Sequence, residues 1–274
     1  MKKLFRATLT AVIGLLTASL IDSWPASAQQ EPPPIVTTPM SAPTPRVYSP
    51  FIPFWEKYNA WLEMVRRTHE DMQPNWMTPL VTVTPTLQQE LRADYSFQFA
   101  PHDLQTFTYV SKGTEIIPTE NTEFIFGNPS YVTKNLPEDK HTSGFADWPF
   151  TFKYRLLSSP SDADNYVVTF LLATTFATGS TTFVSENHDV FSPLIGFGKG
   201  FLTQYGEFDY QATIGPSIPD GNTGQLGTPI TWNSAFQYGN RFHLGEWTIP
   251  LWPALETLWV AYPNGEKMDS SSCT

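Results

Sequence analysis

The sequence predicts an all-β protein, namely an antiparallel up-and-down transmembrane β-barrel with a short N-terminal helix. About 9–10 strands are visible as segments that alternate between apolar and polar residues. Charged residues make up 15% of the 274-residue chain, and aromatic residues also make up 15%. A typical soluble domain has roughly a quarter charged residues, whereas a barrel surface that meets lipid needs few charges. The lengths of the connections, described below, also favour a barrel.

Residues 1–28 have the pattern of a secretory signal peptide: basic residues, an apolar run and small residues. Ala26 and Ala28 fit the small-x-small cleavage rule, so we expect cleavage after Ala28. No later segment is a run of 18 apolar residues, so the sequence predicts no transmembrane helix. An exported chain without such a helix is either soluble or a β-barrel, and we expect the outer membrane of a Gram-negative cell.

Composition and motifs exclude several function classes. The formal net charge of −10 argues against a nucleic-acid partner. Cys273 is the single cysteine, so no intramolecular disulfide or cysteine-based metal site is expected. The chain has no HExxH, Walker-loop or GxSxG motif. We therefore expect no enzymatic activity, no cofactor and no metal.

The segment before the strands divides into two parts. Residues 29–54 are rich in proline and predict a disordered tether. Residues 55–75 predict an amphipathic helix, because Trp55, Tyr58 and Trp61 recur at helical spacing. This helix either packs against one end of the barrel or acts as a plug or a partner site in the periplasm.

The barrel domain is predicted over residues 76–262, followed by a disordered tail over residues 263–274. Its clearest hairpin covers residues 150–172, where a turn rich in Ser, Pro, Asp and Asn joins two alternating arms. Because successive side chains of a strand face opposite sides, one face of this hairpin is aromatic and the other is polar. In a barrel the polar face lines a wet lumen, whereas in a soluble β-sandwich the aromatic side chains fill the core between two sheets.

Connection lengths favour the barrel. Residues 127–148, 177–191 and 216–228 form long connections, and the connections between them are short. Outer-membrane barrels alternate short periplasmic turns with long external loops. The count of nine strands is odd, and the polar tail lacks a terminal aromatic strand. Either one strand is missed in this count, or the chain ends before the barrel closes.

Three segments, residues 165–180, 208–238 and 251–256, resemble a family of uncharacterised proteobacterial outer-membrane proteins. This family is grouped with transporter-like barrels of the meta-pathway phenol-degradation type. The similarity extends from about residue 76 to residue 256. The resemblance implies location and fold more than substrate. Further barrel strands follow LWPELE-like segments in the family, whereas this chain soon ends, so C-terminal truncation is one interpretation.

Two sets of residues are candidates for function. Polar residues on the alternating strands would line the lumen and set its charge selectivity, or would form an internal network that fills a narrow barrel. Tryptophans near strand ends would mark interfacial girdles, or would pack in the core. The lumen candidates are Arg92, Asp94, Lys153, Arg155, Asp209 and Gln211, and the interfacial candidates are Trp148, Trp232, Trp247, Trp252 and Trp259.

These observations lead to three hypotheses for the function. The first is an outer-membrane, transporter- or porin-like barrel in contact with lipid, which passes small solutes passively or is purely structural. The second is a soluble secreted β-sandwich that binds a carbohydrate or another small ligand. The third is a secreted β-rich hydrolase.

Overall fold

The computed structural model describes residues 54–99, 105–135, 141–180, 188–204, 206–221, 227–244 and 247–264. The signal peptide, its cleavage site at Ala26 and Ala28, and nearly all of the tether and tail lie outside these residues.

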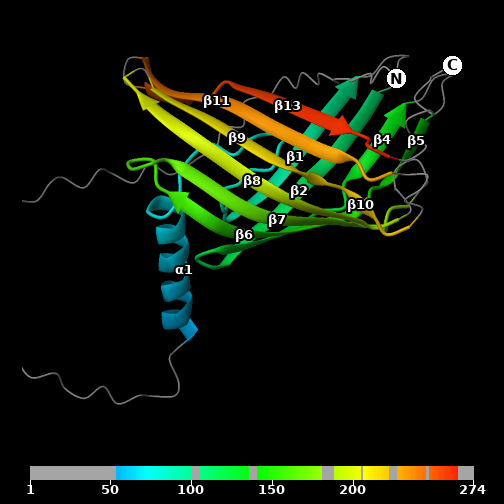
Figure 1. The fold of residues 1–274 in the computed structure, drawn as a ribbon, viewed down its shortest axis with the longest axis horizontal. Coiled ribbons are helices and arrows are strands. Elements are labelled where there is room, and N and C mark those ends of the chain that lie inside the picture. The colour runs from blue at the N-terminus through cyan, green and yellow to red at the C-terminus, as the bar shows by residue number, and fades with distance from the viewer. Residues whose placement is uncertain are drawn as a thin grey trace, which may run out of the picture.

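Within the described residues, one helix precedes thirteen strands of a single antiparallel sheet (Figure 1). The elements are α1 (Phe54–Glu70), β1 (Glu90–Phe99), β2 (Gln105–Thr119), β3 (Thr122–Gly127), β4 (Tyr131–Asn135), β5 (His141–Phe145), β6 (Trp148–Ser159), β7 (Tyr166–Phe176), β8 (Val190–Thr203), β9 (Gly206–Pro216), β10 (Ile218–Pro219), β11 (Ile230–Leu244), β12 (Trp247–Leu251) and β13 (Ala254–Ala261).

Several short strands lie end to end, so the sheet has nine rows. Across the sheet the rows are β1, β2, β3–β4, β6–β5, β7, β8, β9–β10, β11 and β12–β13. The prediction of a mainly antiparallel β-fold with a short N-terminal helix is therefore confirmed. The closed barrel is not observed, because in the described residues the edge rows β1 and β12–β13 do not pair with each other.

The connections follow a rhythm along the sheet. The turns β2–β3, β6–β7, β8–β9 and β11–β12 are short and lie at one end, which we call the turn end. The prediction of a loop over residues 127–148 was wrong, because this stretch contains β4 and β5. These strands continue the rows of β3 and β6. Each is too short for an alternating pattern of apolar and polar residues to be recognised in the sequence.

The two faces of the sheet differ in polarity. On the outer face, aromatic and aliphatic side chains are exposed, including Phe97 at 57% and Phe236 at 54%. On the inner face, charged and amide side chains are buried, including Lys153 at 0% and Gln211 at 1% exposure. Residues 71–89, which connect α1 to β1 and which we call the inner segment, contact this polar face.

Helix α1 ends at Glu70, short of the predicted boundary at residue 75. Pro74 lies just beyond this end, and a residue before proline disfavours the helical conformation. Trp61 Nε1 donates a hydrogen bond of 2.8 Å to the Ile117 carbonyl oxygen near the end of β2. Val65 is buried in a small cluster with Ile117 and Leu87, and this cluster fixes the helix at the turn end.

Alternate glycines on β8 make room for the inner segment. A Cβ atom on Gly198 would lie 2.4 Å from Cζ3 of Trp76, and one on Gly196 would lie 3.0 Å from the Pro85 Cβ. Lys199, which interrupts the apolar outer row of β8, is exposed and donates to the Asp164 carbonyl oxygen in the β6–β7 turn. Its position at the end of the sheet explains why a cation is tolerated there.

We predict that Gly198→Ala destabilises the fold by about 1–3 kcal/mol, because Trp76 is buried and held by a hydrogen bond and cannot move aside freely. The control is Gly221→Ala, since a Cβ atom there has no neighbour within 4 Å. Chemical denaturation followed by tryptophan fluorescence measures both variants. Equal stability of the two would contradict this packing argument.

Candidate functional site: the polar inner face

The inner segment loops across the inner face and returns. Its two limbs are joined by Gln73, whose Nε2 donates to the Leu87 carbonyl oxygen at 2.7 Å and whose Oε1 accepts from the Leu87 N–H at 2.9 Å. Its outgoing limb is held by Trp76, whose Nε1 donates to Asn165 Oδ1 at 2.9 Å. Its returning limb is held by Thr169 of β7, which donates to the Pro85 carbonyl oxygen at 2.6 Å.

The centre of the inner face is an ion pair between neighbouring strands. Lys153 of β6 and Glu123 of β3 are direct cross-strand partners, and Lys153 Nζ lies 2.8 Å from Glu123 Oε1. Both side chains have 0% exposure. Each also binds the inner segment: Lys153 donates to the Thr86 carbonyl oxygen at 3.1 Å, and Glu123 Oε2 accepts from the Gln88 N–H at 2.6 Å. Two buried opposite charges are thus neutralised by each other and by backbone groups.

A second cluster lies on β9. Gln211 Nε2 donates to Asp209 Oδ1 at 2.8 Å and to the Met77 carbonyl oxygen at 3.1 Å. Gln211 Oε1 accepts from the Thr84 hydroxyl at 2.7 Å. The amide of Gln211 therefore bridges both limbs of the inner segment, and Asp209 orients this amide.

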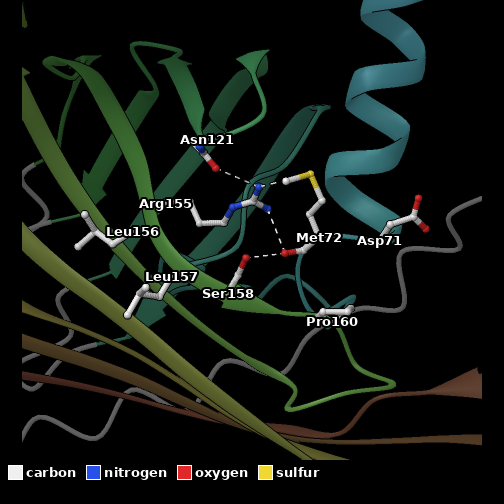
Figure 2. Close-up of a pocket in the computed structure, with 8 residues that line it drawn as sticks. All are labelled: Asp71, Met72, Asn121, Arg155, Leu156, Leu157, Ser158 and Pro160. Carbon is white, nitrogen blue, oxygen red and sulfur yellow. Dashed lines mark hydrogen bonds between the residues drawn. The ribbon is translucent and has the colours of Figure 1, made fainter.

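Arg155 joins the sheet to the C-terminal end of α1 (Figure 2). Its guanidinium donates to the carbonyl oxygens of Thr68 and Met72 at 3.5 Å each, and to the Glu120 carbonyl oxygen at 2.6 Å. A cation beside the last helical carbonyls is stabilised by their partial negative charge. Arg155 also lines a cavity of about 290 Å³, together with Asn121 and Ser158.

The inner segment bridges the unpaired edges of the sheet. The carboxylate of Glu256 on β13 accepts hydrogen bonds of 2.7, 2.8 and 2.7 Å from the backbone N–H groups of Leu80, Val81 and Thr82. From β1, Arg92 donates to the carbonyl oxygens of Pro79 and Leu80 at 3.2 and 3.4 Å. The first and last rows thus bind the same short stretch of the inner segment.

A smaller cavity of about 180 Å³ lies beside this stretch. Its lining includes Arg92, Lys112, Lys153 and Glu115. Lys112 has a left-handed backbone conformation, with φ of 75°, where β2 changes partners from β4 to β3. Glu115 is 5% exposed, and its Oε2 has no hydrogen-bond partner among the described residues. This cavity has room for a few water molecules.

All six polar candidates lie on the inner face, but they do not form one cluster. Arg92, Lys153, Arg155 and Gln211 bind the inner segment or the end of α1 directly. Asp94 and Asp209 instead bind neighbouring side chains, Arg92 at 2.9 Å and Gln211 at 2.8 Å. The arrangement is an internal polar network that joins the sheet, the inner segment and the end of α1.

Three tryptophan candidates lie near the same end of the sheet. Trp148, Trp232 and Trp259 are 42–45% exposed on the outer face, near the end opposite the turn end. Trp252 is half-buried and lies against Gly239, and the side chain of Trp247 lies outside the described residues.

The sequence reasoning missed Glu123 and Glu256. Glu123 alternates with Phe124 and pairs across the sheet with Lys153, so strict alternation could have found it. Glu256 points to backbone N–H groups some 175 residues earlier in the chain, and no local pattern predicts that contact.

No protein-family model, characterised protein or solved structure matches this chain. The resemblance to transporter-like outer-membrane proteins therefore stays a prediction. Of the helices in the described ranges, none combines the length and apolar character needed to cross a membrane. In the same ranges, no group of three or more His, Cys, Asp or Glu side chains is placed to hold a metal ion.

We predict that Lys153→Ala destabilises the fold by about 3–5 kcal/mol, because it leaves the Glu123 carboxylate buried without its counter-charge. The exposed Arg66–Glu63 pair on α1 is the control, and Arg66→Ala is expected to cost at most about 1 kcal/mol. Denaturation midpoints measure both, and a similar loss in the two variants would contradict the central role of the buried pair.

We also predict that Glu256→Ala frees the inner segment from β13. Amide hydrogen exchange at Leu80, Val81 and Thr82 should speed up strongly, because three bonds to one carboxylate are lost. Glu256→Gln keeps one acceptor oxygen and should have a smaller effect. Unchanged exchange in the Ala variant would show that the edge contact does not hold the segment.

Proposed function

We propose that this chain is an outer-membrane protein whose sheet crosses the bilayer, with its outer face against lipid and its polar face around the inner segment. One observation carries the proposal: charged and amide side chains are buried on the inner face, while aromatic and aliphatic side chains are exposed on the outer face. Soluble monomers rarely expose large contiguous apolar surfaces, and such surfaces mark contact with membranes or partners.

The extent of the outer apolar face supports this proposal. The exposed apolar residues come from rows throughout the sheet, so the surface is continuous and not one local patch. They include Leu91, Tyr95 and Phe97 of β1, Phe126 of β3, Tyr154 of β6, Ile195 of β8, Ile214 of β9, Trp232 and Phe236 of β11, and Leu255 and Trp259 of β13.

An orientation follows from the two ends of the sheet. Short turns face the periplasm in outer-membrane barrels, and α1 lies at the turn end, where an exported N-terminal segment would remain. The exposed Trp148, Trp232 and Trp259 lie near the opposite end, where an external aromatic girdle is expected.

The inner segment limits any transport. It contacts strands from β1 to β13 across the inner face, so passive passage of a small solute requires this segment to move. In the conformation described, the protein has a structural role. The transporter-like resemblance supports passage in a second conformation, with no enzymatic activity.

The soluble β-sandwich has less support. Its aromatic side chains would lie between two sheets, whereas the described strands form one sheet with exposed aromatic rings.

We expect the mature chain in the outer-membrane fraction, resistant to alkaline extraction and released only by detergent. Folded protein should migrate differently from boiled protein on a gel, because a lipid-embedded sheet resists unfolding by mild detergent. Recovery in the soluble fraction without detergent would overturn the proposal and favour the sandwich.

A further inference from the structure

Helix α1 has one apolar face, and the sheet covers only half of it. Phe54, Tyr58, Trp61 and Val65 recur at spacings of three and four, so they share a face of the helix. In the C-terminal half of the helix, Val65 is buried against β2 and the inner segment. In the N-terminal half, Phe54 and Tyr58 on the same face are exposed at 70% and 40%.

The uncovered half is an ordered aromatic cluster. Phe54 stacks on Tyr58 with ring centroids 6.2 Å apart, and Tyr58 contacts Trp61 at 5.8 Å. Trp55 meets Phe54 edge to face at 5.3 Å and is 68% exposed. Leu62, one turn after Tyr58, extends the cluster toward the covered half. We call Phe54, Trp55, Tyr58 and Leu62 the helix cluster.

The position of α1 places this cluster to the side of the sheet, at its turn end. Figure 1 shows α1 at the turn end, with its N-terminal half extending past the β3–β6 side of the sheet. The helix runs across the direction of the strands and does not continue it. The covered half of the apolar face lies against the turn end of the sheet. The helix cluster therefore faces in the same direction but lies to the side of the sheet, past its outer face.

We propose that the helix cluster lies on the lipid surface of the bilayer leaflet nearest the turn end. This inference rests on the proposed function, because that leaflet surrounds the turn end only if the sheet crosses the membrane. A helix that crosses the end of a membrane-spanning sheet lies roughly in the plane of the membrane. The part of this helix that extends past the outer face of the sheet is then next to lipid headgroups.

The chemistry of α1 fits this occupant. Trp and Tyr prefer the boundary between headgroups and acyl chains, because their rings are apolar and their N–H or O–H groups need polar partners. The opposite face carries charged residues in both halves of the helix, namely Glu56, Glu63 and Glu70. Arg66 binds Glu63 and Glu70 there, and its hydrogen bond lowers the pKa of the Glu63 carboxyl. One apolar aromatic face and one charged face are typical of helices that lie at a membrane surface.

The test uses a polarity-sensitive fluorophore on single cysteines of the full mature chain, folded into phosphatidylcholine vesicles. All variants carry Cys273→Ser, which removes the natural thiol. Tyr58→Cys reports on the helix cluster, and Ala60→Cys reports on the opposite face of the same half of the helix. Phe236→Cys, in the outer face of β11, reports whether the sheet itself is in lipid. Brominated lipids are the quenchers, with bromine either near the headgroup or deep in the acyl chain.

We expect bromine near the headgroup to quench the label at position 58 and to leave position 60 unchanged, with a blue-shifted emission at position 58 only. Quenching at position 236 by deep bromine together with equal responses at positions 58 and 60 would overturn this inference alone. A blue shift at position 58 without quenching by lipid would also overturn it, because another protein surface would then cover the cluster. No quenching at position 236 would overturn the proposed function itself.

Discussion

The buried contact between the inner segment and the polar face of the sheet is the constraint on which the rest of the structure depends. Lys153 and Glu123 lie on adjacent strands at 0% exposure, where an unpaired charge would be very costly. The inner segment supplies the remaining partners, the Thr86 carbonyl oxygen and the Gln88 N–H. The sheet therefore needs the segment to satisfy its polar face, and the segment, which has no regular structure of its own, needs the sheet.

The inner segment also compensates for the unpaired edge strands of the sheet. Unpaired edge strands expose backbone donors and acceptors, which is costly in water and more so in lipid. Residues from the first and last rows, Arg92 and Glu256, bind the same stretch of the inner segment, so the segment ties the two edges together without a strand between them. The glycines at positions 196 and 198 allow this close approach, because a Cβ atom at 198 would collide with Trp76 and one at 196 would crowd Leu171 and Pro85.

Much of this arrangement was predictable from the sequence, and the failures have clear causes. Period-two alternation placed Lys153, Arg155 and Gln211 on the inner face, since each strand sorts its own side chains. It did not reveal β4 and β5, which are five residues each, because so short a pattern is indistinguishable from a loop. The predicted lumen is occupied by residues 71–89, whose threonines, prolines and glutamines carry no periodic signal.

The sequence by itself determined the longer strands, the polarity of their two faces and the helix, because each depends on spacing along a few neighbouring residues. Only the tertiary structure decided what fills the inner face and how the edges are joined. The bonds from Glu256 to Leu80, Val81 and Thr82 connect groups about 175 residues apart, and they form only once the sheet has curved enough to bring both edges to one segment. Contacts of that kind depend on the curvature of the whole sheet, which local patterns do not encode.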